Sequence, residues 1–393
     1  MRTRAIIHLN HFKENVNSVR RRIGKDRHIC VSVKADAYGH GALRIAKASI
    51  EAGAYCLGVA SVSEGSELRR GGIKAPILLF SQPQPKEIAD IIKANLTIFI
   101  SDTEFADVLN ERAKAAKVKL NVHLKIDTGM GRLGCSAKEA VALARHIKKR
   151  KALKLTGTAT HFAVSDSPNR RDIDYTKAQL SRFKRAVNAI RNEGINPGIV
   201  HAANSGAIIL HPASWFDMVR PGILLYGYKT VEEYEAPLDY LKKLSRLKSL
   251  KIEPVMELRG KISLIKKIKK GESVSYGRTW SAGKDTFIGI LTTGYADGFP
   301  RLASNRWQIV IGGKVYPLVG RVTMDQCCVN LGKKPDVRRW DEAIIFGSDI
   351  YPTEPDSQVI RQSAAALAEV VGTIPYEITC NINKRVPRVY VTS

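Results

Sequence analysis

The six cysteines of the chain are scattered, and none forms a Cys-x-x-Cys pair or lies in a histidine-rich cluster. The sequence therefore indicates neither a disulfide framework nor a structural zinc site. No apolar run approaches the ~18 residues that a membrane-spanning helix needs. The apolar run at residues 5–7 is too short for the core of a signal peptide. We expect a cytoplasmic protein that has no membrane contact.

Acidic residues are scarce: 37 aspartates and glutamates stand against 63 lysines and arginines, which gives a net charge of +26. Such an excess is typical of proteins that bind nucleic acid or anionic surfaces. The most basic stretch, residues 242–270, contains no aromatic residue, whereas binding of single strands depends on aromatic stacking. We therefore expect a solvated basic surface and no specific nucleic-acid partner, with a polyanion-binding protein as the alternative.

From residue 28 to about residue 227, short apolar runs alternate with longer amphipathic stretches. This alternation is typical of parallel strands joined by helices. It predicts eight strands, at residues 29–33, 56–60, 77–80, 97–100, 120–125, 155–160, 198–201 and 216–219. Helices are predicted between strands, at residues 40–51, 102–116, 137–149 and 174–192. The strand count favours a (β/α)8 TIM-type barrel in the α/β class, and an open doubly wound sheet is the alternative.

After Lys242 the pattern changes to short alternating apolar stretches separated by glycine-containing turns. This pattern predicts a C-terminal, mostly-β domain. Its strands are expected at residues 261–265, 286–291, 309–311, 314–318, 329–331 and 342–346, with one helix at 363–371. We therefore assign residues 1–240 to the barrel and residues 241–393 to the β domain.

Polar and reactive residues follow the ends of several predicted strands, and they are Lys34, Arg132, His161, Asn204, Ser205, Arg220 and Gly222. Singly, each has an ordinary structural explanation, such as a solvated charge or an ion pair. In a barrel, however, the carboxyl ends of the strands form the active-site face. A lysine there can form a Schiff base with an aldehyde, and Ser205 and Gly222 offer donors to a phosphate. Together these features predict pyridoxal 5'-phosphate as cofactor, and no spacing of acidic residues and histidines indicates a metal site.

Eight short motifs extend this pattern over nearly the whole chain: VSVKADAYGHG (31–41), IDTGMGRLG (126–134), HAANSG (201–206), VRPGILLYG (219–227), VSYGRTW (274–280), GYADGFPR (294–301), GRVTMDQ (320–326) and IPYEITCNINKRVPRVY (374–390). In this order the sequence resembles the alanine racemases, which are fold-type III pyridoxal-phosphate enzymes. The resemblance implies interconversion of L- and D-alanine, with D-alanine supplied for peptidoglycan. It also implies a homodimer whose active sites are shared between the subunits.

The resemblance also implies a role for individual residues. Lys34 would hold the cofactor and act as the base on one face of the substrate, and Tyr276 of the partner subunit would act on the other face. Arg220 would face the pyridine nitrogen, held by His161. The remaining cofactor positions are Tyr38, Asn204, Ser205, Gly222, Ile223 and Tyr376. Arg132 would bind the substrate carboxylate, and the partner subunit would contribute Tyr295, Met324 and Asp325. Lys125 matches a lysine that can be carbamylated to fix the arginine.

Three departures from the family pattern stand out. Gly206 and Thr323 replace an alanine and a cysteine that are usual there, and residues 228–254 are longer and more basic than usual. Other enzymes and binding proteins are alternatives: a broader racemase that accepts serine, a fold-type III decarboxylase of basic amino acids, or a non-catalytic pyridoxal-phosphate carrier. The decarboxylase is disfavoured because it would place an acidic residue at the ring nitrogen, where this sequence has Arg220.

Overall fold

The apolar runs of the first half of the chain form one closed parallel barrel in the computed structural model, which describes residues 2–231, 236–245, 248–349 and 360–392. The strands follow the order β5-β4-β3-β2-β10-β9-β8-β6, and β5 also pairs with β6. Their bounds are β2 (His28–Ser32), β3 (Cys56–Val59), β4 (Ile77–Leu79), β5 (Leu96–Ile100), β6 (Leu120–Asp127), β8 (Leu153–Ala159), β9 (Ile199–His201) and β10 (Met218–Val219). The closing pair confirms the predicted barrel, and the open sheet is wrong.

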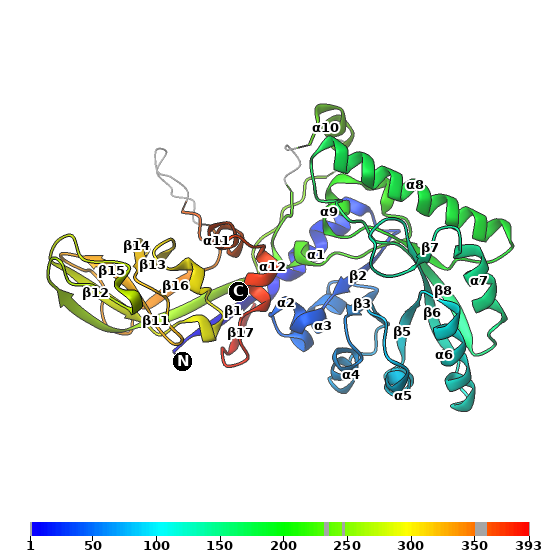
Figure 1. The fold of residues 1–393 in the computed structure, drawn as a ribbon, viewed down its shortest axis with the longest axis horizontal. Coiled ribbons are helices and arrows are strands. Elements are labelled where there is room, and N and C mark those ends of the chain that lie inside the picture. The colour runs from blue at the N-terminus through cyan, green and yellow to red at the C-terminus, as the bar shows by residue number, and fades with distance from the viewer. Residues whose placement is uncertain (1, 232–235, 246–247, 350–359, 393) are drawn as a thin grey trace.

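Helices surround the barrel in Figure 1. They are α1 (Leu9–Ile23), α3 (Ala42–Glu51), α4 (Val62–Arg70), α5 (Ile88–Lys93), α6 (Thr103–Ala115), α7 (Ala140–Lys149), α8 (Arg170–Asn192) and α9 (Ser205–Leu210). The four helices predicted from the sequence correspond to α3, α6, α7 and α8. Every residue of β3 and β4 is buried, because one face of each strand meets the barrel interior and the other meets the helices.

The second half of the chain forms a mostly antiparallel β domain, as predicted. Its strands are β11 (Met256–Ile268), β12 (Thr286–Leu291), β13 (Gln308–Ile311), β14 (Lys314–Val319), β15 (Cys327–Gly332) and β16 (Glu342–Phe346), and pairing of β11 with β12 closes them into a ring. In β11 buried Met256, Leu258 and Ile262 alternate with more exposed neighbours, so one face meets the core. Two helices follow, α11 (Ala364–Val371) and α12 (Pro375–Cys380).

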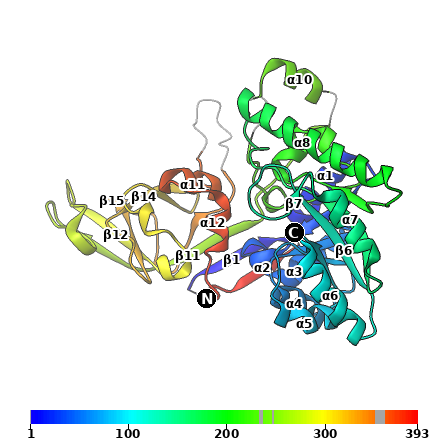
Figure 2. The same cartoon turned by 45° about the vertical axis from the view of Figure 1, so that its right-hand side comes forward.

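Both ends of the chain join the β domain, and this arrangement was not predicted. β1 (Arg4–His8) pairs antiparallel with β11 and parallel with β17 (Arg388–Val391). These strands lie between the barrel and the β ring in both views (Figures 1 and 2). We still propose a division near residue 240, with β1 as an N-terminal strand that crosses into the second sheet.

The basic stretch between the domains is only partly described. Helix α10 (Leu238–Leu244) lies within it, and residues 232–235 and 246–247 are outside the described residues. Within the described ranges, no helix combines the length and the apolar character that crossing a bilayer requires.

Candidate active site

The chain after β2 adopts an unusual turn that positions Lys34. In α2 (Lys34–Tyr38) the four residues after Lys34 all have φ between 52° and 54°. This left-handed conformation costs an L-residue about 1–2 kcal/mol, so its neighbours must impose it. The Glu64 carboxylate accepts a hydrogen bond from the Ala35 N–H at 2.7 Å, and Asp36 Oδ1 accepts one from the Ala42 N–H at 2.7 Å. Helix α4 therefore helps to hold the Lys34 backbone through Glu64.

The Lys34 amine is placed where it loses its proton more readily than a surface lysine. Burial, and then the positive charge of Arg132, lower the pKa of Lys34 below its ordinary value. A larger fraction of Lys34 is therefore uncharged at neutral pH. An uncharged amine can act as a nucleophile or as a base.

The Lys34 side chain lines a cavity of about 500 Å³ at the carboxyl ends of the barrel strands. This volume is in the usual range for a small-molecule site. Most of the predicted site residues line the cavity: Lys34, Tyr38, Lys125, Arg132, His161, Asn204, Ser205, Arg220, Gly222 and Tyr376. Ile223 follows Gly222 but is fully buried and is not in the lining. Barrel topology has thus brought Lys34 together with Arg220 and Gly222, and helix α12 of the second half adds Tyr376.

Arg220 is buried at one side of the cavity, where it is held by neutral acceptors. Its Nη2 donates to Thr160 O at 2.8 Å and to Ala202 O at 3.0 Å, and His161 Nδ1 lies 3.3 Å away. Its Nη1 donates to His201 Nδ1 at 2.7 Å. No carboxylate pairs with it among the described residues, and burial lowers its pKa to about 10. Arg220 therefore remains a cation whose charge is not neutralised by the protein.

Ser205, Gly222 and Tyr38 form a small polar pocket in the cavity wall. Ser205 Oγ accepts hydrogen bonds from the Gly222 N–H at 3.0 Å and the Leu224 N–H at 3.4 Å, which leaves its own proton to be donated. A Cβ at Gly222 would lie 2.5 Å from Tyr38 Oη, so a larger residue there would have to displace the Tyr38 hydroxyl. The Asn204 side chain caps α9, because its Oδ1 accepts a hydrogen bond from the Ala207 N–H at 3.0 Å. Ser205 and Tyr38 thus offer hydroxyl donors to an anion.

Two more basic residues, Lys125 and Arg132, lie at the cavity. Lys125 is 7% exposed, and burial, followed by the charge of Arg220, holds its pKa well below the ordinary value. Its Nζ lies 5.8 Å from the centre of the Phe99 ring. Arg132 is exposed at the rim and makes no hydrogen bond or ion pair with another described residue. Its guanidinium is therefore available to an anionic group in the cavity.

The remaining predicted residues lie on the β domain and do not line this cavity. Tyr276 is 73% exposed, Met324 53% and Tyr295 42%, and Asp325 pairs with Arg385. The segment around Tyr276 has left-handed φ values at Ser275 and Gly277. Ser275 Oγ donates to Arg321 O at 2.6 Å, which fixes this turn. Tyr276 is therefore exposed on the β domain, in a turn whose conformation is fixed by hydrogen bonding.

Sequence reasoning missed several residues of the site. Glu64 and His201 support the predicted Lys34 and Arg220, whereas Ser81, Gln82 and Phe99 line the cavity. The last three follow or end β4 and β5, so the rule that strand ends face the site could have found them. The local pattern marks Glu64 only as the partner of Ser61 in a capping box, and its contact with the Lys34 backbone depends on the left-handed turn.

Comparisons with known proteins assign the family. Residues 7–230 match the model of the alanine racemase N-terminal domain, and residues 255–390 match that of the C-terminal domain. An alanine racemase of Treponema denticola is 48% identical over 99% of this chain and 98% of its own, and one of Treponema pallidum is 42% identical over 98% of each. The solved alanine racemase of Clostridium difficile 630 superposes with a TM-score of 0.89 and 34% identity, over 100% of this chain and 96% of that one. The chain belongs to the alanine racemase family.

Proposed function

We propose that the protein is a homodimeric, pyridoxal-phosphate-dependent alanine racemase that interconverts L- and D-alanine. The observation that carries this proposal is the cavity itself. It combines Lys34, whose pKa is lowered, with two guanidinium groups, Arg132 and Arg220, that have no carboxylate partner among the described residues. An amine that shares a cavity with two unneutralised guanidinium groups suits a ligand that carries both a carbonyl group and negative charge.

The residues present fit pyridoxal phosphate. The hydroxyls of Tyr38 and Ser205, with Gly222 and Tyr376, would hold the phosphate, supported by Asn204 and Ile223. Arg220 would face the ring nitrogen, and a guanidinium does not readily give up a proton to it. When bound, the cofactor withdraws electrons from the substrate Cα and so acidifies the Cα proton.

Two bases on opposite faces of Cα would carry out the racemisation. Lys34 would remove or return the proton on one face, and Tyr276 of the partner subunit would do so on the other. Arg132 would bind the substrate carboxylate and hold Cα between them. Inversion at Cα requires that the returning proton arrive from the face opposite to removal.

The exposed residues of the β domain support a homodimer. Tyr276, Met324, Leu302 and Ile374 are all more than half exposed. We take these side chains as part of the dimer contact, where a partner subunit would gather them into one covered apolar surface. In the dimer, this face would cover the cavity of the partner, where Tyr295, Met324 and Asp325 would narrow the space for the substrate side chain.

A narrow site favours alanine because discrimination against each extra methylene is worth about 1–3 kcal/mol. The product would supply D-alanine for peptidoglycan. We place the enzyme in the cytoplasm, in agreement with six free cysteines. We further propose that Lys125 carries a carbamate that fixes Arg132.

The decisive experiment is incubation of the purified enzyme with L-alanine in deuterated water, followed by chiral analysis. We expect D-alanine that carries deuterium at Cα. Lys34→Ala should abolish both the product and the borohydride-sensitive absorbance of the bound cofactor, whereas Lys47→Ala, on the exposed face of α3, should change neither. Parallel incubations with L-serine and L-lysine test the broader racemase and the decarboxylase. Absence of D-alanine would refute the proposal.

A further inference from the structure

Residues 379–388, near the C-terminal end of the β domain, run between the Lys34 turn (residues 34–39) and a turn of the β ring at residues 294–298. On the barrel side, the Gly39 backbone lies against Thr379, since a Cβ at Gly39 would be 2.0 Å from Thr379 O. Arg388 Nε donates a hydrogen bond to Gly39 O at 3.0 Å. The end of the Lys34 turn is therefore in direct backbone contact with this segment.

On the other side, the same segment lies against the turn that carries Tyr295. A Cβ at Gly298 would be 2.4 Å from Asn381 O, so these backbones also touch. The Asn383 N–H donates to Asp297 O at 3.3 Å. The Tyr295 turn (residues 294–298) in turn packs on the Met324 loop (residues 323–325), where a Cβ at Gly294 would be 2.2 Å from Thr323 O.

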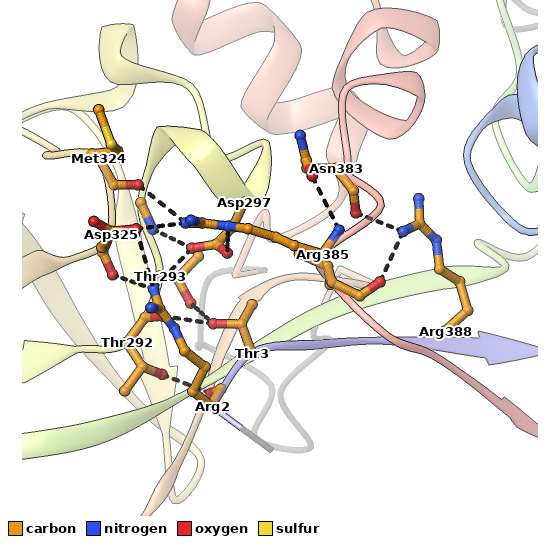
Figure 3. A network of polar contacts seen from close by, with 12 residues as sticks. Arg2, Thr3, Thr292, Thr293, Asp297, Met324, Asp325, Asn383, Arg385 and Arg388 are labelled. Carbon is orange, nitrogen blue, oxygen red and sulfur yellow. Dashed lines mark hydrogen bonds and ion pairs between the residues drawn. The ribbon is translucent and has the colours of Figure 1, made fainter.

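An ion-pair network fastens the β-domain side of this contact (Figure 3). The Asp297 side chain is only 4% exposed, and its Oδ1 accepts a hydrogen bond from Arg385 Nε at 2.8 Å. Arg385 Nη2 lies 2.8 Å from Asp325 Oδ1 and donates to Met324 O at 3.4 Å. Arg2 approaches the same two carboxylates, at 3.4 Å and 3.9 Å. Arg385 thus ties residues 379–388 to both loops at once.

Arg388 also joins the segment to itself through hydrogen bonds. Arg388 donates through Nη2 to Ile382 O at 2.6 Å, and through Nη1 to Asn383 O at 2.7 Å and Val386 O at 2.8 Å. Backbone contacts without intervening side chains leave little room for independent movement. A shift on one side must therefore be transmitted to the other.

We propose that residues 379–388 form a rigid bridge that couples the two active sites of the dimer, with Arg385 as its positioning residue. Within one protomer, the bridge joins the Lys34 turn of its own site to the Tyr295 turn and Met324 loop. This inference rests on the proposed function in one respect: those loops would belong to the partner's site. The bridge then links Lys34 in one site to the substrate-covering loops of the other.

Hydrogen exchange of the cofactor-loaded protein tests the bridge without any assay of racemisation. Arg385→Gln should speed exchange at residues 294–298 and 323–325, and also at residues 33–41, where the N–H groups of Ala37, Gly39 and Gly41 are hydrogen-bonded within the turn. Exchange in α7 should not change. Arg361→Gln is the matched control, because Arg361 forms an exposed ion pair with Glu369 in the same domain. Faster exchange confined to the β-domain loops, or spread equally over α7, would overturn the proposal.

Mixed dimers test the functional consequence. One protomer carries Tyr276→Phe and the other Lys34→Ala, so the single intact site combines Lys34 of the first with Tyr276 of the second. Arg385→Gln placed in either protomer should raise KM for alanine by about threefold or more, as expected for a modest coupling energy. The opposing outcome is a KM that rises only when Arg385→Gln is in the protomer that supplies Tyr276. In that case Arg385 only holds a loop of its own domain in place, and the proposed coupling is refuted.

The mixed dimers also separate this inference from the proposed function. Lack of activity in the mixed dimer that retains Arg385 would contradict the shared site, and the hydrogen-exchange result would still decide the bridge. Arg385→Lys provides a second variant should Arg385→Gln not fold, because lysine keeps the charge but lacks the forked donors that reach two carboxylates. It should produce the same pattern of exchange in weaker form.

Discussion

Arg220 Nη1 donates a hydrogen bond to His201 Nδ1 over 2.7 Å, and this bond determines the tautomers of two buried histidines, His201 and His123. A guanidinium has only donors, so His201 Nδ1 must be an acceptor and its proton must lie on Nε2. That proton is donated to His123 Nδ1, 2.9 Å away. Both imidazoles are therefore neutral, and Arg220 is held without neutralisation of its charge.

Buried neutral histidines predict that stability falls in mild acid. Burial lowers the pKa of His123 to about 3, and those of His40 and His211 to about 4. Below the unfolded value of about 6.5, the unfolded chain binds protons that the folded chain does not. The free energy of unfolding should therefore decrease from pH 6.5 towards pH 5, by up to about 1.4 kcal/mol per pH unit for each such histidine.

Urea unfolding at several pH values measures this slope. His211 suits this test because it contacts Tyr240 and does not line the cavity. In His211→Asn, the free energy of unfolding should depend less steeply on pH, by about the uptake of one proton, since one buried neutral histidine has been removed. Stability that rises between pH 6.5 and pH 5 would be incompatible with neutral buried histidines.

The close approach of Gly222 to Tyr38 predicts that the proposed phosphate site is sensitive to substitution at Gly222. In Gly222→Ala, the new Cβ would displace the Tyr38 hydroxyl. Overpacking of this kind costs about 1–3 kcal/mol, so affinity for pyridoxal phosphate should fall about tenfold or more. Titration of the cofactor-free protein, followed by fluorescence, gives the dissociation constant. Gly283→Ala is the matched control, since a Cβ there meets nothing within 4 Å. Equal affinities of the two variants for pyridoxal phosphate would contradict the proposal that Gly222 and Tyr38 bind the phosphate.

Removal of the Tyr276 hydroxyl should affect the two substrate enantiomers unequally. Tyr276→Phe keeps the ring but loses the group proposed to act on one face of Cα, and loss of such a group typically costs about 10²–10⁴ in rate. Single-turnover exchange of the Cα proton, measured separately for L- and D-alanine, distinguishes the two faces. Tyr55→Phe, on another partly exposed tyrosine, should leave both rates unchanged. Unchanged exchange for both enantiomers in Tyr276→Phe would exclude it as a base.

The barrel could be predicted because its strands are short apolar runs in regular alternation with helices. The predicted bounds of all eight barrel strands, from β2 to β10, lie within a few residues of the observed ones, and those of β12 and β16 coincide with them. Pairing between distant segments could not be predicted in the same way. The strand β1 has no local feature that distinguishes a barrel strand from one that pairs with β11 and β17.

The site shows the same limit. Lys34 and Arg220 could be found because they follow strand ends, and barrel geometry gathers strand ends on one face. Glu64 could not, because its hydrogen bond to Ala35 depends on four consecutive left-handed residues. Alanine and tyrosine rarely adopt this conformation, so local propensity argues against the turn that positions the lysine.

The burial of Lys125 predicts a reaction with carbon dioxide. Burial and the charge of Arg220 lower the pKa of Lys125 well below its ordinary value, which favours an uncharged, nucleophilic amine. Its nitrogen can attack carbon dioxide, form an N–C bond and release one proton, which leaves a carbamate anion near the Arg132 guanidinium.

Labelling with ¹³C-bicarbonate should then give one carbamate resonance in the NMR spectrum of the enzyme. This resonance should be absent in Lys125→Ala and retained in Lys47→Ala. Activity of Lys125→Ala should fall and be partly restored by acetate, because a free carboxylate can take the place of the carbamate beside Arg132. An unlabelled enzyme whose activity does not depend on bicarbonate would show that Lys125 acts as a plain amine.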